Sequence, residues 1–159
     1  MIRVVRADLD DPRHQDAILE MTRAYARDPM GDERDLSADS QQRLIGGLRG
    51  HPTTLVFLAF DGARPVGIAT CFLGFSTFAA RPLVNVHDLH VVPEFRRRGI
   101  GRRLLEAVET RARELGCCRL TLEVQERNRV ALELYARFGF VAGQYAPDAG
   151  PVLFRVKKL

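Results

Sequence analysis

The sequence predicts a mixed α/β (α+β) domain whose sheet is mostly antiparallel and gains a parallel neighbour toward the C-terminal end. Between residues 54 and 92, three apolar runs rich in β-formers are separated by short connections, as in antiparallel hairpins. Between residues 100 and 124, an amphipathic run with helical spacing leads into another strand-like run, which indicates a crossover to a parallel strand. A chain of 159 residues with 46% apolar residues is long enough for one such domain, and we expect a single domain over residues 1–159.

The first part of the chain is expected to form one short strand, over residues 3–7, and two helices. Aspartate and serine cap helix N-termini, proline fits a first turn, and the residue before a proline leaves the helical region. The residues that begin or end the two helices on these grounds are Asp10 or Asp11, Pro12, Asp28-Pro29, Ser37 and His51-Pro52.

The middle of the chain is expected to form three strands, over residues 54–60, 66–72 and 84–92. Asp61-Gly62 is typical of a tight hairpin turn between the first two. Residues 75–82 either extend the second strand or form a loop.

The last part of the chain alternates helices and strands. Apolar residues recur at helical spacing from Ile100 to Leu115, and glycine is a common C-terminal stop. The expected elements are a helix over 100–115 ending at Gly116, a strand over 119–124, a helix capped by Asn128 and ended by Gly139, and strands over 140–142 and 152–157.

The segment Arg96-Arg97-Arg98-Gly99-Ile100-Gly101 lies between a predicted strand and a predicted helix. A turn of this kind points unpaired backbone N–H groups and the positive end of a helix dipole toward one place, where an anion can bind. Arginine matches phosphate in charge and in fork geometry, so we interpret the turn as a pyrophosphate site. Five arginines (96, 97, 98, 102 and 103) fall within eight positions, so the basic charge is local. A nucleic-acid-binding face would recruit more of the chain.

Other classes of protein find little support in the sequence. The longest apolar run, residues 55–60, is far shorter than the roughly 20 residues that span a membrane, and no signal peptide is visible. Two of the three cysteines, Cys117 and Cys118, are adjacent, which favours a reduced, cytoplasmic setting. The histidines and cysteines lack the spacing of a metal site, so we expect no metal.

Two blocks of residues resemble the Gcn5-related N-acetyltransferase (GNAT) superfamily. The first is Val91-x-Pro93-x-x-Arg96-x-x-Gly99-x-Gly101, similar to the Arg/Gln-x-x-Gly-x-Gly/Ala signature of that superfamily. The second consists of Leu122-Glu123-Val124, Asn128, Ala131, Leu134-Tyr135 and Gly139-Phe140 at matching spacing. The chain resembles most the uncharacterised bacterial members, a resemblance that indicates no particular acceptor.

The resemblance implies a sheet of about seven strands with four helices, in which the fourth and fifth strands splay apart around acetyl-CoA. The pantetheine arm would pair with the backbone of the fourth strand, and the turn would hold the pyrophosphate through backbone N–H groups. The positions that match acetyl-CoA contacts are Leu89, His90, Val91, Arg96, Arg97, Arg98, Gly99, Ile100, Gly101, Arg102, Asn128 and Ala131.

For catalysis, the resemblance implies Tyr135 as the general acid that protonates the departing thiolate. The base is less well matched. A glutamate of the histone-acetylating branch falls at Asn85, and an amide cannot accept a proton. Many relatives carry an acidic pair where this chain has His87-Asp88. Strand alternation groups His87 with Leu89 and Val91, and Asp88 with His90. Deprotonation by His87, relay through water, and binding of an already neutral amine all stay open.

The expected activity is transfer of acetyl from acetyl-CoA to a primary amine of a small molecule or peptide, directly within a ternary complex. Nothing indicates a nucleic-acid or membrane partner, and homodimers are common in the superfamily. The alternatives are a non-catalytic acyl-CoA-binding or sensor domain and, with less support, a nucleic-acid-binding module. The residues expected to contact the amine acceptor are Tyr25, Asp28, Phe75, Phe78 and Asn85, although aromatic residues near strands are also typical of a core.

Overall fold

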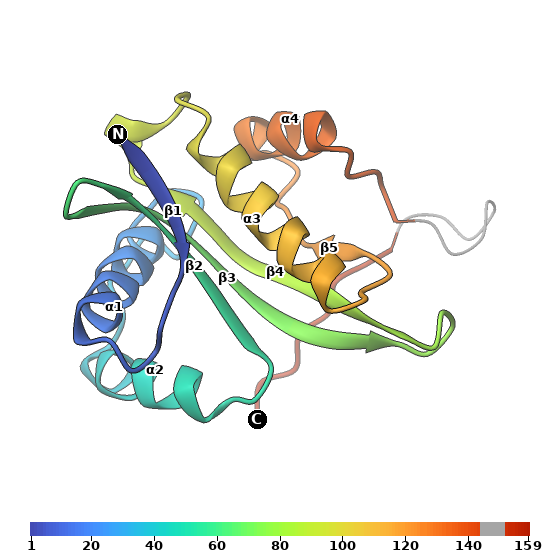
Figure 1. Cartoon of the computed structure of the whole chain (residues 1–159), viewed down its shortest axis with the longest axis horizontal. Coiled ribbons are helices and arrows are strands. Elements are labelled where there is room, and N and C mark those ends of the chain that lie inside the picture. Colours follow the sequence, from blue (N-terminus) through green and yellow to red (C-terminus); the bar gives the residue numbers. More distant parts are fainter. Residues whose placement is uncertain (144–151) are drawn as a thin grey trace. The chain divides into compact units, whose positions relative to one another are not determined.

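The computed structural model describes residues 1–143 and 152–159, which fall into two compact units, Met1–Gln125 and Glu126–Leu159. Each unit is described by itself below (Figure 1). The first contains β1 (Ile2–Arg6), α1 (Pro12–Ala26), α2 (Ala38–Gly50), β2 (Thr54–Asp61), β3 (Arg64–Ser76), β4 (Arg81–Val91), the 3-10 turn η1 (Pro93–Phe95), α3 (Ile100–Glu114) and β5 (Leu120–Leu122); the second contains α4 (Arg129–Phe138).

The strands of the first unit form one sheet in the order β1-β2-β3-β4-β5. The first four strands pair antiparallel, and β5 pairs parallel to β4 after the α3 crossover, which confirms the mixed sheet. The parallel pairing ends where Val86 meets Leu122, whereas β4 continues to Val91. The predicted separation of the fourth and fifth strands is therefore present, and the last five residues of β4 have no partner in β5.

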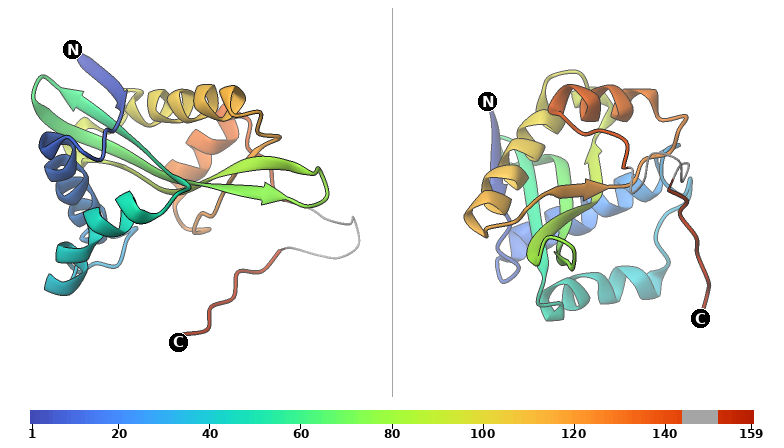
Figure 2. Two further views of the ribbon diagram at one scale, coloured as in Figure 1. Left: turned by 60° about the horizontal axis from the view of Figure 1, so that its bottom comes forward. Right: turned by 90° about the vertical axis from the view of Figure 1, so that its right-hand side faces the viewer.

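Helices cover both faces of this sheet. Figure 2 shows α1 and α2 on one face and α3 on the other. The buried side of α1 carries Ala17, Ile18 and Met21, and that of α3 carries Leu104, Leu105 and Val108. Because the central strands are covered on both sides, residues 55–60 of β2 are all buried, which explains their continuous apolar run.

The predicted helix ends are confirmed by their hydrogen bonds. The carboxylate of Asp11 accepts from the N–H of Arg13 at 2.9 Å, and the hydroxyl of Ser37 accepts from the N–H of Ser40 at 3.1 Å. In the second unit, Asn128 caps α4 through its side-chain oxygen, and Gly139 ends it with φ 104°. A φ in the left-handed region strains residues that have a Cβ, so glycine suits this stop.

The number of strands requires a correction, because the described residues form five and not about seven. Strands were expected over 140–142 and 152–157, yet the described residues there are irregular. The N–H of Phe140 donates to the carbonyl of Tyr135 at 2.9 Å, which completes the helix terminus in place of a strand ladder. Strand propensity depends on a neighbouring strand and on burial, and Phe154, for example, is 69% exposed.

A second correction concerns the faces of β4. Thr70 pairs with Asp88 and Cys71 with Val86, so His87 is an extra residue in the strand, a β-bulge. The ring of His87 meets Phe72 edge-on with centroids 5.4 Å apart. Leu89 and Val91 lie on the α3 face, because a Cβ on Gly67, the partner of Val91, would lie 3.2 Å from Leu104. The bulge therefore separates His87 from the two residues with which simple alternation grouped it.

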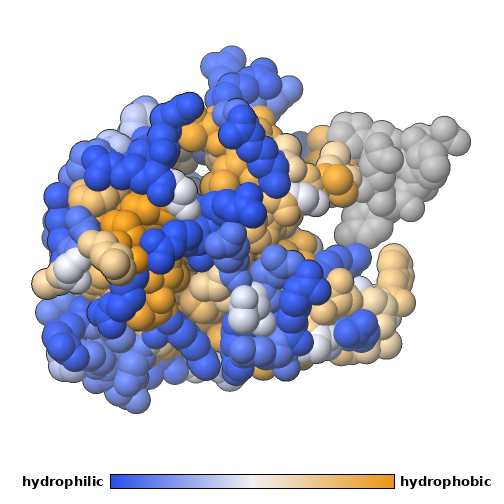
Figure 3. Space-filling model, turned by 45° about the horizontal axis from the view of Figure 1, so that its top comes forward, coloured by the Kyte–Doolittle hydropathy of each residue, from blue (hydrophilic) through white to orange (hydrophobic). Residues whose placement is uncertain are grey.

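Polar side chains dominate much of the surface. Figure 3 shows hydrophilic residues over most of the face it presents, with apolar residues between them. Among the described residues, none of the helices has both the length and the apolar character needed to cross a membrane.

Candidate active site

The turn between β4 and α3 exposes a run of backbone donors. Arg97 and Gly99 have φ values of 60° and 76°, and Gly99 is the N-cap of α3. The first N–H bonded back into the helix is that of Arg103, which donates to the carbonyl of Gly99 at 3.1 Å. The six N–H groups from Arg97 to Arg102 donate to none of the residues that the structure describes. Free donors at the positive end of a helix dipole suit a phosphate group.

The arginine side chains of the turn differ in what they contact. Arg96 donates through Nε to the carbonyl of Val91 at 2.9 Å, and its guanidinium forms an ion pair with Asp28. Arg98 lies over the ring of Phe95, 4.9 Å from the centroid. Of the three arginines expected beside the phosphate, Arg96 is thus engaged by the protein, whereas the backbone donors are unengaged.

Asp28 lies at the C-terminal end of α1 and is 7% exposed. Burial opposes its ionisation, but the N–H of Met30 and the guanidinium of Arg96 outweigh burial, so the pKa of Asp28 is lowered. This carboxylate, predicted to contact the acceptor, connects the end of α1 to the β4–α3 turn. Its two oxygens accept from Met30 and Arg96.

His90 is buried beside this ion pair, on the face of the sheet that α1 covers. Its ring lies 5.5 Å from the ring of Tyr25, and its Nε2 has no hydrogen-bond partner among the described residues. Burial lowers the pKa of His90 to about 4, opposed by the charge of Asp28 and assisted by that of Arg96. The imidazole is therefore neutral at pH 7.

We expect this buried histidine to make the folding stability depend on pH. Below pH 6.5 the unfolded chain binds a proton at His90, whereas the folded chain does so only near pH 4. The free energy of unfolding should thus be highest above pH 6.5 and decrease by about 3 kcal/mol as the pH falls from 6.5 to about 4. Urea unfolding of the wild type and of His90→Gln from pH 7.5 to 4.5 measures this decrease in the free energy of unfolding. Parallel pH dependences of the two proteins would contradict the expectation.

Asp88 and the bulged His87 are adjacent to this cluster. Burial raises the pKa of the Asp88 carboxyl, and the charge of His87 opposes that rise. Burial also raises the pKa of Tyr25, and the charges of Asp88 and Asp28 add to the effect. Asp88, Tyr25 and His90 thus lie together on one face of the sheet, and His87 lies on the same face but is exposed, beside Phe72. A carboxylate with a raised pKa is a stronger proton acceptor than an ordinary one.

The other residues expected to contact the acceptor lie farther along β3 and β4. The amide nitrogen of Asn85 donates to the hydroxyl of Thr121 at 3.2 Å, across the β4–β5 pairing. Phe75 and Phe78 are 63% and 90% exposed at the far end of the β3–β4 hairpin. At about 3.3 Å per residue, Phe75 is roughly 16 Å along the strand from Thr70, the partner of Asp88. The structure does not bring these two aromatic rings to the cluster.

The second unit holds the remaining predicted residues on or beside α4. Asn128 accepts from the N–H of Ala131 at 3.2 Å, a capping role that leaves its amide N–H groups for another partner. Tyr135 is 9% exposed, and its ring meets Phe140 edge-on at 5.7 Å.

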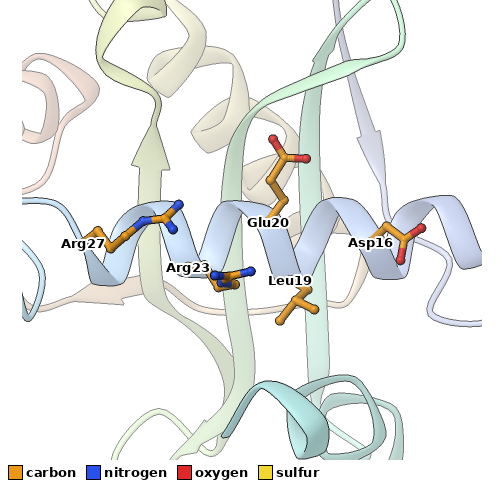
Figure 4. Close-up of a pocket in the computed structure, with 5 residues that line it drawn as sticks. All are labelled: Asp16, Leu19, Glu20, Arg23 and Arg27. Carbon is orange, nitrogen blue, oxygen red and sulfur yellow. The ribbon is translucent and has the colours of Figure 1, made fainter. Parts of the chain in front are cut away.

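A small depression on α1 has a different character (Figure 4). It is lined by Asp16, Leu19, Glu20, Arg23 and Arg27. Arg23 and Arg27 both form ion pairs with Asp35, at 2.6 and 3.2 Å. Because both of its arginines are already paired with Asp35, we do not consider this depression a candidate active site.

Sequence reasoning missed the Asp28–Arg96 ion pair and the burial of His90. The two partners of the pair are 68 positions apart, and no local pattern joins them. For His90, the sequence contained one usable signal: as the second residue after Asp88 it shares a face with it, and α1 needs a sheet face to cover its apolar stripe.

Residues 16–140 match the model of the acetyltransferase (GNAT) family, so the match extends from α1 to the end of α4. The chain belongs to the GNAT family.

Curated relatives match over about half of the chain. A thialysine N-epsilon-acetyltransferase of Caenorhabditis elegans is 34% identical over 85 residues, which cover 54% of this chain and 52% of the relative. The N-alpha-acetyltransferase MAK3 of Arabidopsis thaliana is 36% identical over 87 residues, 55% of this chain and 45% of the relative. The matched stretch spans about half the length of these curated relatives.

Solved structures show the same fold. An aminoglycoside acetyltransferase from an uncultured soil metagenomic sample, in complex with sisomicin, has a TM-score of 0.82 at 19% identity, over 99% of this chain and 96% of that one. The aminoglycoside N-acetyltransferase AAC(6')-Iy, in complex with CoA, has a TM-score of 0.76 at 16% identity, over 100% of this chain and 96% of that one.

Proposed function

We propose that this protein is an acetyl-CoA-dependent N-acetyltransferase that acts on a primary amine of a small molecule or peptide, by direct transfer in a ternary complex. The observation that carries the proposal is a run of six N–H groups, from Arg97 to Arg102, that donate to none of the described residues. This run follows β4 and the short η1 turn, and the last residues of β4 lack a partner in β5. Family membership and the CoA complex of a protein with the same fold support it.

Acetyl-CoA fits the residues present. Its pyrophosphate would accept from the N–H groups of Arg97, Arg98, Gly99, Ile100, Gly101 and Arg102, and Arg97 is free to add charge because it forms no ion pair with a described residue. Its pantetheine amides would pair with the edge of β4 that β5 leaves open at Leu89 to Val91, where the carbonyl of Val91 already accepts from Nε of Arg96. Asn128 would offer its amide N–H groups. Arg96 would act indirectly, by fixing the turn to Asp28.

Within that complex, Asp88 would take the proton of the attacking ammonium, directly or through water, and so supply a neutral amine. The amine nitrogen bonds to the acetyl carbon, the carbon–sulfur bond breaks, and Tyr135 would donate its phenolic proton to the departing thiolate. The nitrogen then releases its second proton to water, from which the phenolate of Tyr135 is protonated again. The raised pKa of Asp88 supports the first role, and His87 beside it would influence that pKa through its charge.

Measurements of acetyl-CoA binding test whether the β4–α3 turn holds the pyrophosphate. Acetyl-CoA at 100 times its Kd should stabilise the protein by about 2.7 kcal/mol, seen as a rise in melting temperature. Gly99→Ala should weaken this binding by roughly tenfold or more, because a Cβ at φ 76° strains the turn that aims the donors. The matched control is Gly62→Ala: Gly62 also has a positive φ, 60°, and an added Cβ at either glycine meets no atom within 4 Å. Gly62 lies in the β2–β3 hairpin and not in the β4–α3 turn.

Release of CoA across a panel of amines then distinguishes an enzyme from a sensor. An unchanged melting temperature with acetyl-CoA would refute the proposal. Stabilisation without turnover of any amine would instead indicate a non-catalytic acyl-CoA-binding domain.

A further inference from the structure

An open groove lies between α2 and the sheet, on the face that also carries Asp88. Its volume is about 690 Å³, within the range of small-molecule sites. Its walls are largely apolar, formed by Leu44 and Leu48 of α2 and by Phe72 of β3, and His51 lies at one end. The imidazole of His51 stacks on the ring of Phe72 with centroids 5.1 Å apart.

Two adjacent glycines of α2, Gly46 and Gly47, line this groove. Glycine is the poorest helix former after proline, so a helix carries it in its interior at a cost. Close packing does not require glycine at these positions, since a Cβ at either one would meet no atom within 4 Å. The backbone conformation does not require glycine either, because both residues have φ in the ordinary range. The absence of side chains at these positions leaves space in the groove.

One aromatic side chain, Phe72, connects the groove to the proposed reaction centre. Phe72 forms a wall of the groove, and its ring makes a T-shaped contact with the ring of His87, with centroids 5.4 Å apart. Because His87 is the bulged residue next to Asp88, a molecule lying along Phe72 has its end directed toward these two side chains.

The charges of the groove favour a particular kind of occupant. Among its lining residues, none is acidic, and the one permanent cation, Arg43, is paired with Asp39 at 2.5 Å. A polyamine or aminoglycoside would bring several positive charges to walls that offer no counter-charge. An amine with one charge and an apolar body would bury the body and keep its charge near Asp88.

We propose that the acceptor is a monoamine with an apolar or aromatic body, which lies in the groove between α2 and Phe72 with its amine directed at His87 and Asp88. The inference rests on the proposed function and adds the class of substrate to it. It treats Gly46 and Gly47 as residues that determine specificity by leaving room for that body.

A series of amines and one pair of variants test the proposal on the full-length protein. In CoA-release assays with ethylamine, butylamine, hexylamine, 2-phenylethylamine and spermidine, kcat/KM should rise about fourfold for each added CH₂ and be low for spermidine. Gly47→Leu should raise the KM for 2-phenylethylamine about tenfold or more and leave the KM for acetyl-CoA unchanged. Gly50→Leu is the matched control, because Gly50 also belongs to α2 and has open space around it but does not line the groove.

Direct binding separates this inference from the proposed function. Titration of 2-phenylethylamine, followed by the NMR signals of the His51 imidazole, should shift those signals in the wild type and in Gly50→Leu but not in Gly47→Leu. Shifts without acetyl transfer would refute the enzyme and keep the binding site. Acetyl transfer that is indifferent to body size and to Gly47→Leu, or fastest with spermidine, would overturn the inference and keep the enzyme. Absence of both shifts and transfer would overturn the two together.

Discussion

Replacing Asp88 with asparagine is expected to lower kcat for acetyl transfer by roughly 10²–10⁴-fold, the range in which general bases contribute. The substitution keeps the shape of the side chain and removes its capacity to accept a proton. Because burial raises the pKa of Asp88, the wild-type rate should rise with pH through that raised pKa, as the carboxylate becomes available. The asparagine variant should lack this limb of the pH–rate profile.

Stability measurements show whether a loss of activity in Asp88→Asn is caused by misfolding. A buried carboxyl whose pKa is raised in the folded state costs stability above its unfolded value of 3.8, because the folded chain opposes ionisation. Asp88→Asn should therefore melt at the same or a higher temperature than the wild type at pH 7. Asp16→Asn, an exposed aspartate of α1, is the matched control and should retain activity. If His87→Gln lost more activity than Asp88→Asn, the histidine would be the base.

Replacing Tyr135 with phenylalanine is the second change expected to have a large effect, again roughly 10²–10⁴-fold on kcat. The substitution retains the buried ring and its contact with Phe140, and removes only the hydroxyl. The KM for acetyl-CoA should change little, because the proton is needed when the thiolate departs and not when the thioester binds.

The leaving group decides whether Tyr135 acts as an acid or only supports the fold. An acetyl thioester of an aryl thiol releases a weaker base than CoA and needs less help from a proton donor. If Tyr135 is the acid, Tyr135→Phe should lose much less activity with the aryl thioester than with acetyl-CoA. An equal loss with both donors would assign the hydroxyl a structural role.

Local chemistry made much of the fold predictable. Asp11, Ser37 and Asn128 were expected to cap helices, and each does so through its own side chain. Gly62 and Gly139 have the positive φ that their turns require. These features are decided within a few residues of one another, so the sequence contains the information needed to infer them.

Tertiary context decided the rest. The His87 bulge arises in the pairing of β3 with β4, and no residue pattern in β4 alone marks it. Asp28 was predicted to contact the acceptor as the first residue of a loop, and its ion pair with the distant Arg96 was not predictable from any local pattern. The strand-like composition of residues 152–157 produced no strand, because strand formation depends on a partner that propensity does not describe.

The bulge makes β4 unusually sensitive to changes in length. Because His87 is one residue more than the pairing requires, losing it would let the strand return to simple alternation. The chain would gain a more regular ladder and lose the local twist that places consecutive side chains, His87 and Asp88, on one face. Substitutions at position 87 alter the chemistry of one side chain, whereas a deletion there removes the distortion itself. A length change of one residue is therefore the more damaging kind of variation at this point of the sheet.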